Sequence, residues 1–476
     1  MYYRTTLLVS GQDPARYSSL MYLTRRKLLK SLAHFTVASS ACQLLPTFVA
    51  SSVQSNDPLY GINAYYLLIE SYRKAKQNPT GNVRQTIIKY LEDDLGLARL
   101  RDKSKVNAIR FWAFNNYPSV RKKVGKKQVN FDTPLWTTAN QLDNQVLEIL
   151  QIMMQHLAEM GFYLVPVLSN YWIGYGGILR YLEWAGRITQ DEWFDAYCNL
   201  KSEEFYLKYS IDFYTISEIE KLFHEHVNSV INSFRNNHKV VIVDVMNEPR
   251  GKSHYSVSNQ IVRDGLYSHQ IVARWLNRQA ASLRENLPST VSLTSGEEGW
   301  LLSPVDLSLN YLKNESQYYE GIDLKTNLSA KNSAFTMGSI HMYPHELVEL
   351  PKVNDCGKEY TEQRGWYYLL QPNQPQIPKS YIKMGDEWLK SRAVAIANKP
   401  WYVGEIGWCR SQSQENRSPL PATALQEERS KIYQHWAEQA FAMGARGVFL
   451  WGLDGLQHRD EFYGLNSTQV MAIFPK

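Results

Sequence analysis

Short, continuous apolar runs alternate with longer amphipathic segments through most of this sequence, and no other feature restricts its fold as much. The strands of a parallel sheet are buried on both faces and therefore read as such runs, usually with a helix in each crossover. The predicted strands are residues 59–64, 106–112, 162–168, 240–246, 291–294, 335–340, 401–404 and 447–450. The predicted helices include residues 83–101, 144–160, 216–235, 268–285, 381–398 and 426–443. We therefore predict an α/β fold, a closed (β/α)8 TIM barrel that forms a single domain.

The main alternative for this alternation is an open, doubly wound parallel sheet. Such a sheet usually carries a Gly-rich phosphate-binding turn with GxGxxG spacing after an early strand. The nearest candidate, Gly-Tyr-Gly-Gly at 174–177, lacks that spacing. The closed barrel is therefore the better prediction.

The first 55 residues differ from the rest of the chain. A basic stretch at 24–30, which contains the pair Arg25 and Arg26, precedes a moderately apolar stretch at 31–50. This order is typical of a signal peptide, and the paired arginines resemble a bacterial twin-arginine export signal. An amphipathic N-terminal helix is the alternative. We expect residues 1–55 to be an extension with a signal peptide, residues 56–476 to be the barrel domain, and the protein to be exported to the periplasm or secreted.

Charge and composition restrict the partners. The net charge is +6 over 476 residues, and the basic run at 121–127 has no aromatic or Gly-rich context, so we predict a solvated loop there and no nucleic-acid partner. Aromatic residues make up 13% of the chain. A large core accounts for that excess, although aromatic faces also bind sugar rings.

The cysteines and histidines do not indicate a metal site. None of Cys42, Cys198, Cys356 and Cys409 lies in a CxxC pair, which disfavours a zinc ribbon or a thioredoxin-like site. If Cys42 leaves with the signal peptide, the remaining three form one disulfide and one free thiol, or no disulfide. The spacing of His341 and His345 would need a helix to bind a metal, yet Pro344 lies between them. We expect no metal and no cofactor.

Polar and aromatic side chains gather where the predicted strands end, which is where barrel enzymes carry their active sites. Glu248 follows the fourth strand and Glu405 follows the seventh. These strands lie on roughly opposite sides of the barrel, so the two carboxyl groups can approach to the separation of about 5–5.5 Å that a retaining glycoside hydrolase needs. The other residues at these ends include Asn63, Arg110, Trp112, Asn170, Trp172, Asn247, Arg250, His341, Tyr343 and Trp451.

The neighbours of the two glutamates suggest their roles. Arg110 and Tyr343 can both donate to a carboxylate near strand seven, which favours an ionised Glu405 acting as nucleophile. Glu248 would then have a negative neighbour and keep its proton near neutral pH, as a general acid requires. Asn247 can bind the 2-hydroxyl of the reacting sugar. A second acidic pair, Glu297 and Glu298, follows strand five; we expect one of them to contact a distal sugar or support the site, with a structural salt bridge as the alternative.

Several motifs resemble glycoside hydrolase family 5, and within it the endo-β-1,4-mannanases. The motifs are Asp-Phe-Tyr-Thr at 212–215, Met-Asn-Glu-Pro-Arg at 246–250, Gly-Glu-Glu-Gly-Trp at 296–300, His-Met-Tyr-Pro at 341–344 and Lys-Pro-Trp-Tyr-Val-Gly-Glu at 399–405. Asn-Tyr-Trp at 170–172, followed by Tyr-Gly-Gly at 175–177, adds to them. The resemblance spans about residues 58–455. The chain departs from it in its short 236–240 segment, in the basic loop at 121–130 and in Leu-Trp-Gly-Leu-Asp at 450–454.

The resemblance implies a retaining, endo-acting hydrolase of β-1,4-mannosidic bonds in mannan, glucomannan or galactomannan. It makes Glu248 the acid/base and Glu405 the nucleophile, with a supporting role for Arg110, Asn247, His341 and Tyr343. From their places at strand ends, we also expect Trp112 and Glu298 to bind substrate. It implies that Trp451 is the platform under the sugar, that Trp172 lines the glycone side and that Arg250 binds leaving-side sugars. The alternatives are a β-1,4-glucanase of the same family and a non-catalytic carbohydrate-binding barrel. We expect the partners to be a β-mannan polysaccharide and the export machinery, and the protein to be a monomer.

Overall fold

The computed structural model describes residues 57–118, 121–124, 127–131, 134–253, 260–303, 320–329, 333–344, 348–364, 378–396, 399–409, 422–458, 460 and 463–476. The N-terminal extension, with its predicted signal peptide, lies outside these residues. No helix among the described ones is both long enough and apolar enough to cross a membrane.

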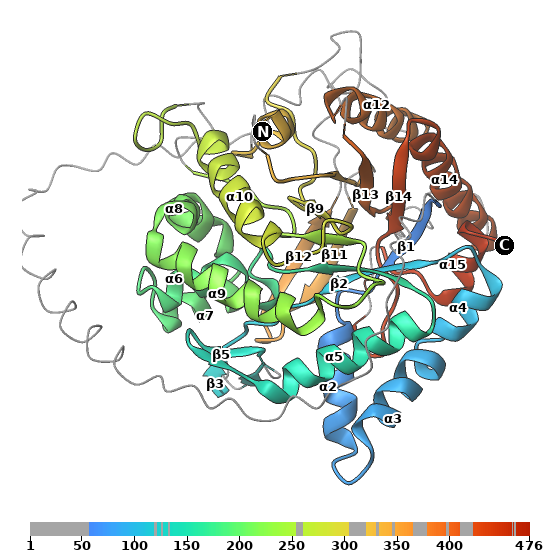
Figure 1. The fold of residues 1–476 in the computed structure, drawn as a ribbon, viewed down its shortest axis with the longest axis horizontal. Coiled ribbons are helices and arrows are strands. Elements are labelled where there is room, and N and C mark those ends of the chain that lie inside the picture. The colour runs from blue at the N-terminus through green and yellow to red at the C-terminus, as the bar shows by residue number, and fades with distance from the viewer. Residues whose placement is uncertain are drawn as a thin grey trace, which may run out of the picture. The chain divides into compact units, whose positions relative to one another are not determined.

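Eight parallel strands form the central sheet, in the order β10-β13-β14-β1-β2-β7-β8-β9 (Figure 1). They are β1 (Leu59–Asn63), β2 (Ala108–Trp112), β7 (Tyr163–Val167), β8 (Ile242–Asp244), β9 (Ser292–Thr294), β10 (Gly338–Met342), β13 (Trp401–Ile406) and β14 (Ala445–Leu450). Between the edge strands, Thr336 N donates to Leu293 O at 3.0 Å and His341 N to Glu298 O at 3.0 Å. These bonds nearly close the barrel, and the predicted (β/α)8 fold is confirmed.

Helices connect the strands and pack around the barrel (Figure 1). They are α2 (Leu67–Gln77), α3 (Val83–Lys89), α4 (Leu97–Lys103), α5 (Asn144–Glu159), α6 (Gly177–Trp184), α7 (Gln190–Cys198), α8 (Ser202–Thr215), α9 (Ser217–Phe234), α10 (Ser268–Arg284), α11 (Leu324–Ser329), α12 (Pro378–Ile396), α14 (Ala422–Ala442) and α15 (Ser467–Ile473). The predicted helix at 83–101 is instead α3, a π-helical turn at Tyr90–Asp94 and α4. Gly96, at a left-handed φ of 70°, separates the π turn from α4 and cannot continue a right-handed helix.

Within the described part of the chain, three hairpins stand outside the barrel: β3 (Arg121–Val124) with β4 (Lys127–Asn130), β5 (Trp136–Thr138) with β6 (Gln141–Leu142), and β11 (Val348–Val353) with β12 (Glu359–Arg364). The prediction of a loop over the basic run at 121–127 is therefore wrong. Arg121–Val124 and Lys127–Asn130 pair as antiparallel strands instead.

The barrel interior is filled by side chains from successive strands. One buried layer consists of Leu59, Ala108, Val165, Ile242, Met337, Tyr402 and Phe449. A Cβ atom on Gly61 would lie 2.1 Å from Cδ1 of Phe449, so only glycine fits in β1 beside that ring. Because this layer is packed, the residues at the carboxyl ends of the strands stand on a rigid floor.

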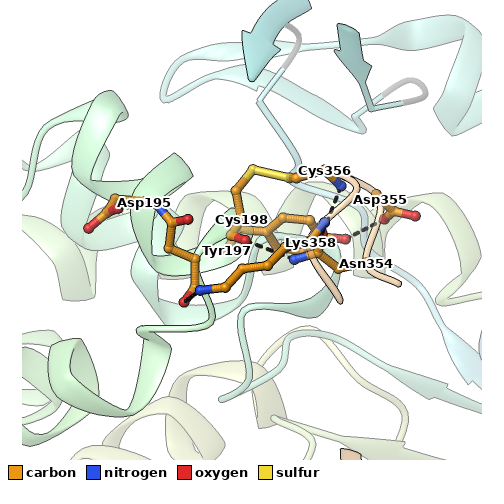
Figure 2. The surroundings of a disulfide bond; sticks show 8 residues. Asp195, Tyr197, Cys198, Asn354, Asp355, Cys356 and Lys358 are labelled. Atoms are coloured by element: carbon orange, nitrogen blue, oxygen red, sulfur yellow. Dashed lines mark hydrogen bonds between the residues drawn. A yellow bond between two sulfur atoms is a disulfide. The ribbon is translucent and has the colours of Figure 1, made fainter. Parts of the chain in front are cut away.

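A disulfide joins two crossovers (Figure 2). Cys198, at the end of α7, is bonded to Cys356, in the turn between β11 and β12, with the two Cα atoms 5.3 Å apart. Tyr197 donates to the Asp355 carboxylate at 2.6 Å beside it. Cys409 is a buried thiol. Of the alternatives that the sequence left open, the structure has one disulfide and one thiol, and the disulfide ties the β7–β8 crossover to the β10–β13 crossover.

Candidate active site

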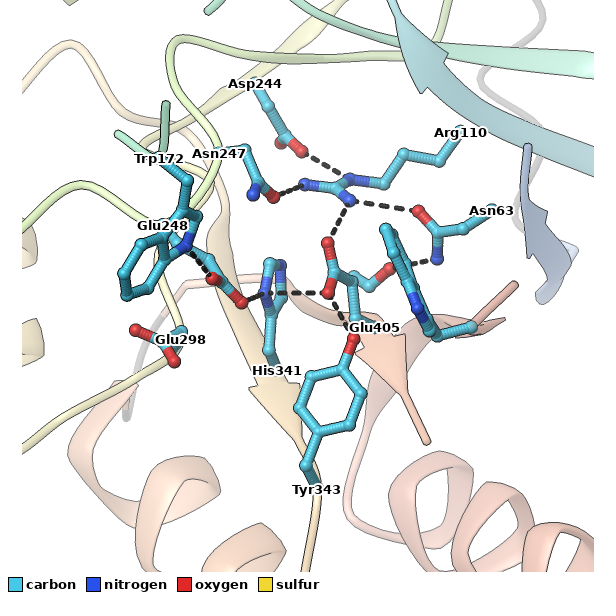
Figure 3. A network of polar contacts seen from close by, with 12 residues as sticks. Asn63, Arg110, Trp172, Asp244, Asn247, Glu248, Glu298, His341, Tyr343 and Glu405 are labelled. Carbon is cyan, nitrogen blue, oxygen red and sulfur yellow. Dashed lines mark hydrogen bonds and ion pairs between the residues drawn. The ribbon is translucent and has the colours of Figure 1, made fainter. Parts of the chain in front are cut away.

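Glu248 and Glu405 meet at the carboxyl ends of the barrel strands, as the sequence predicts (Figure 3). Both are buried. One carboxyl oxygen of each, together with a ring nitrogen of His341, lies within 4.8 Å of the others. Two carboxyl groups at this distance can act on the same bond from two sides.

Glu405 is held by a cation and a phenol. Arg110 Nη1 donates to its Oε1 at 2.7 Å, and the Tyr343 hydroxyl donates to its Oε2. His341 Nδ1 lies 3.5 Å from the same Oε2. The predicted contacts of Arg110 and Tyr343 with the strand-seven carboxylate are therefore present.

The pKa of Glu405 moves in the direction opposite to the one expected from those contacts. Burial raises the pKa of Glu405 above its usual range, and the nearby Glu248 adds to the rise. Arg110 and Tyr343 oppose the rise without reversing it. The expectation from the sequence weighed the donors to Glu405 and left out the cost of burying its charge, which is the largest cause of the rise.

Arg110 is fully buried on β2 and uses several nitrogen atoms. Its Nε donates to Asp244 Oδ2 at 2.8 Å, its Nη1 also donates to Asn63 Oδ1 at 2.9 Å, and its Nη2 donates to Asn247 Oδ1 at 2.9 Å. The guanidinium therefore orders four acceptor side chains from β1, β8, β13 and the segment after β8. Asn247 donates in turn to Asn170 Oδ1 at 3.2 Å, which fixes its amide beside Glu248.

Glu248 has two neutral partners. Trp172 Nε1 donates to its Oε2 at 2.5 Å, and His341 Nδ1 lies 2.8 Å from its Oε1. Burial lowers the pKa of His341 to about 4, so the ring is neutral at neutral pH. Trp172 was predicted to line the glycone side, and its hydrogen bond to Glu248 gives it a further contact that the sequence did not indicate.

The backbone at Glu248 is strained. Its φ is 49°, a left-handed value that costs a residue with a side chain about 1–3 kcal/mol. Glu248 N donates to Gly296 O at 2.9 Å. Gly296 itself has a φ of 75°, and a Cβ on it would lie 2.0 Å from Met246 O. The close approach of these two segments holds Glu248 in a conformation that aims its carboxyl group into the site.

Glu298 and Arg250 form a buried ion pair with each other. Arg250 Nε and Nη2 donate to the two Glu298 oxygens at 2.8 and 2.7 Å, and Arg250 Nη1 lies 2.9 Å from Glu320 Oε2. The Arg250 guanidinium also stacks on the Trp172 ring, 4.7 Å from its centroid. These contacts match the salt-bridge alternative, and they link Glu298 to Glu248 through Arg250 and Trp172. The neighbouring Glu297 accepts from Ser295 and Asn327, and burial raises its pKa to about 7.

An aromatic wall lies beside the carboxyl pair. Trp451 stacks on Tyr65, with ring centroids 5.0 Å apart and planes at 9°. Trp112 lies 6.1 Å from both rings. Trp451 Nε1 donates to Asp460 Oδ2 at 3.0 Å, which fixes the ring plane. Trp451 remains partly exposed, as a sugar platform requires.

The loop that follows Trp451 is anchored on α2. Glu70 accepts from the backbone N–H groups of Leu456, Gln457 and His458 at 2.8–3.1 Å. Burial opposes ionisation of Glu70, but hydrogen bonds from His458 and Tyr90 overcome it and lower the pKa of Glu70 to about 2. The anchor therefore stays charged at any working pH of the protein.

Sequence reasoning missed two residues of this network, Asp244 and Tyr402. The Tyr402 hydroxyl lies 2.6 and 2.7 Å from the two Asp244 oxygens. A charged residue inside the apolar run 240–246 was the available signal, because a strand buried on both faces tolerates a carboxylate only with partners.

Glu248, His341 and Glu405 are the only group among the described residues whose donor atoms are spaced as a metal site would need. Trp172, Arg110 and Tyr343 already donate hydrogen bonds to the carboxyl oxygens, and His341 Nδ1 lies 2.8 Å from Glu248 Oε1.

Known proteins resemble the chain in both sequence and fold. The model of the GH family 5 β-mannosidase-like proteins matches residues 81–326. Mannan endo-1,4-β-mannosidase A of Podospora anserina is 25% identical over 310 residues, which cover 64% of this chain and 62% of the relative. Mannan endo-1,4-β-mannosidase 4 of Solanum lycopersicum is 23% identical over 291 residues, 60% of this chain and 58% of the relative. The chain thus spans about three fifths of the length of these relatives.

Solved structures share the fold. An endo-1,4-β-D-mannanase from Thermotoga petrophila superposes with a TM-score of 0.54 and 18% identity, covering 85% of this chain and 92% of that one. An endo-1,4-β-mannanase from Rhizomucor miehei gives a TM-score of 0.53 and 18% identity, with 88% and 93% covered. At this identity the likeness supports the barrel, and the chemistry has to be argued from the site.

Proposed function

The chain belongs to glycoside hydrolase family 5, among its β-mannosidase-like members, and we propose that it is a retaining, endo-acting hydrolase of β-1,4-mannosidic bonds. The substrate class would be mannan, glucomannan or galactomannan. Two lines of support meet in this proposal: the family and its mannan-cleaving relatives, and the geometry of the two carboxyl groups.

The observation that carries the proposal is the approach of Glu248 and Glu405 to within 4.8 Å. Retaining glycosidases hold their carboxyl groups about 5–5.5 Å apart, whereas inverting ones need about 6.5–9.5 Å to admit a water molecule. The short separation favours direct attack by one carboxylate on the sugar. The partners of each group then favour Glu405 as the attacking one.

The reaction would proceed in two displacements. Glu405 Oε2 attacks the anomeric carbon while Glu248 gives its proton to the departing glycosidic oxygen, leaving a glycosyl ester on Glu405. Glu248, now a carboxylate, takes a proton from water, and the resulting hydroxide adds to the anomeric carbon and releases Glu405. Net retention follows from the two inversions. Arg110 and Tyr343 would hold Glu405 in line, and Trp451 would support the sugar face.

The test compares substrates and variants. Purified protein is incubated with ivory-nut mannan, glucomannan and carboxymethylcellulose, released reducing ends are measured, and ¹H NMR follows the configuration of the first product. We expect hydrolysis of the two mannans, a β-configured first product, and rates at least about 1,000-fold lower for Glu405→Gln and Glu248→Gln. Faster cleavage of carboxymethylcellulose would make the protein a glucanase, and an α-configured first product would exclude a retaining mechanism.

A matched control uses Glu220→Gln. Glu220 accepts a bidentate ion pair from Arg278 on the outer helices, so the substitution removes a carboxylate of the same type away from the site. Its activity should equal that of the unmodified protein. An equal loss in this control would mean that the fall in Glu405→Gln reports folding.

We also propose that the protein is exported through the twin-arginine route, with removal of the N-terminal extension. The support is the basic stretch with Arg25 and Arg26 ahead of a moderately apolar stretch. N-terminal sequencing of the protein from the periplasm or medium, beside an Arg25→Lys/Arg26→Lys variant, tests it. Retention of the wild-type protein inside the cell with an intact N-terminus would contradict the proposal.

A further inference from the structure

Arg110 is placed between two carboxylates. Its Nε lies 2.8 Å from Asp244 Oδ2 and its Nη1 lies 2.7 Å from Glu405 Oε1. Arg110 and Asp244 have no exposed side-chain surface, and Glu405 has 3%. One guanidinium thus serves two buried carboxylates at nearly equal distances.

Asp244 also accepts hydrogen bonds from two hydroxyl groups. The Tyr402 hydroxyl lies 2.6 Å from its Oδ1, and Thr294 Oγ1 donates to the same oxygen at 3.0 Å. Burial raises the pKa of Tyr402, so its phenol is a neutral donor. Burial opposes the charge on Arg110, yet Asp244 and Glu405 raise its pKa above the usual range. Arg110 therefore stays positively charged, and its charge interacts with both Asp244 and Glu405.

The sharing of Arg110 between the two carboxylates affects Glu405. A guanidinium that served Glu405 alone would stabilise its negative charge strongly, since Coulomb attraction is large in a water-free site. Such stabilisation would make the carboxylate a weaker nucleophile. Asp244 competes for the same cation from β8, on the far side of the guanidinium from Glu405.

We infer that Asp244 is a positioning residue that draws Arg110 partly away from Glu405 and so keeps the nucleophile from being over-stabilised. The inference rests on the proposed function, because it assigns Glu405 the role of nucleophile. The other ionisable groups facing Glu405 are Glu248, His341 and Tyr343, and those facing Asp244 are Arg110, Tyr402 and His341.

The first test is Asp244→Asn, which keeps the shape and one acceptor oxygen but removes the charge. Glu405 is then the one carboxylate that Arg110 contacts, so the pKa of Glu405 falls. Because kcat/KM rises with pH as Glu405 ionises, its acid limb should move to lower pH by about one unit. The plateau kcat should fall by about tenfold, since the carboxylate is held more tightly.

The second test is Tyr402→Phe, which leaves the Asp244 charge in place but removes a donor to it. Asp244 then draws more strongly on Arg110, and the acid limb should move to higher pH. Opposite shifts in the two variants are not expected from a merely structural role. If Asp244→Asn fails to fold, as judged by circular dichroism, Tyr402→Phe alone decides: an upward shift supports the inference, and an unchanged limb overturns it.

Asp212→Asn is the matched control, because Asp212 on α8 also pairs with two arginines, Arg187 and Arg263. It should leave the pH profile unchanged. A readout without substrate comes from ¹³C NMR of carboxyl-labelled glutamate, with the Glu405 signal assigned by Glu405→Gln. A titration midpoint that is the same in Asp244→Asn and wild type would overturn the inference. If the wild type hydrolyses no mannan, the proposed function fails, while this titration still tests the charge division.

Discussion

Replacing Glu298 with glutamine is expected to destabilise the protein far more than it weakens substrate binding. Glu298 receives two hydrogen bonds from Arg250 at 2.7 and 2.8 Å and a third from Trp300 Nε1 at 3.0 Å. Glu298 is 4% exposed and Arg250 8%. A carboxylate so fully engaged has little capacity left for a sugar hydroxyl, so its contribution is to hold Arg250 against Trp172.

The expected loss in the free energy of unfolding depends on the partners that Arg250 keeps in the Glu298→Gln variant. Removing one partner of a buried ion pair costs about 3–5 kcal/mol when the other charge is left alone. Arg250 keeps Glu320 at 2.9 Å, and the amide oxygen that the Glu298→Gln substitution introduces can still accept one hydrogen bond. We therefore expect the free energy of unfolding to fall by about 2 kcal/mol, which is within the range for a hydrogen bond to a charged group. Because Glu320 keeps Arg250 over Trp172, KM should change less than about twofold.

Urea unfolding at pH 7 and steady-state kinetics on mannan oligosaccharides measure both quantities. The control is Glu220→Gln, which makes the same change in a bidentate pair with Arg278, whose side chain is 53% exposed. That variant should lose no more than about 1 kcal/mol. The reasoning is refuted if Glu298→Gln keeps its unfolding free energy while KM rises tenfold, since Glu298 would then be a substrate contact.

Three further predictions concern pH, the disulfide and the aromatic wall. Burial lowers the pKa of His226 to about 4, against about 6.5 in the unfolded chain, so the free energy of unfolding falls as the pH drops from 6.5 towards 4. The His226→Phe substitution should reduce this loss by roughly 3 kcal/mol, as measured by urea unfolding at pH 7 and pH 4. An unchanged pH dependence would contradict the prediction. Cys356→Ser removes a disulfide that closes a loop over a sequence separation of 158 residues, and the chain-entropy model predicts a loss of about 5 kcal/mol in the free energy of unfolding. The variant should unfold at the same temperature as the reduced wild-type protein. If a reductant does not change the thermal unfolding of the wild type, the disulfide is not formed. Trp451→Ala should lower kcat/KM on mannotetraose by about 100-fold, and a fall below threefold would remove it as the sugar platform.

Much of the architecture was predictable because it depends on a repeating pattern. Each barrel strand must be apolar on both faces, so the sequence marks every one of them, even Ser292–Thr294 with three residues. The pairing of Glu248 with Glu405 then follows from counting strands. Strand lengths were less predictable: β8 covers only Ile242–Asp244, because the chain leaves the sheet early to turn Glu248 into the site.

The interactions that tune the site were not predictable in this way. Asp244 and Tyr402 lie inside apolar runs 158 positions apart, and only closure of the barrel brings them together. The hydrogen bond between Trp172 and Glu248 joins residues 76 positions apart, and sequence spacing does not predict where the indole N–H points. Which two cysteines pair depends equally on the packing of α7 against the β11–β12 hairpin. Contacts between two crossovers do not produce a periodic pattern in the sequence, so the sequence does not predict them.

The two carboxyl groups differ more in the charge of their partners than in their burial. Glu405 has a permanent cation and a phenol, whereas Glu248 has the indole N–H of Trp172 and the neutral ring of His341. A negative charge is stabilised better by the first set than by the second. The first set therefore suits Glu405 to the role of nucleophile, while Asp244 takes only part of Arg110. The division of roles thus rests on where the buried guanidinium of Arg110 points, and the strength of the nucleophile rests on how that guanidinium is shared.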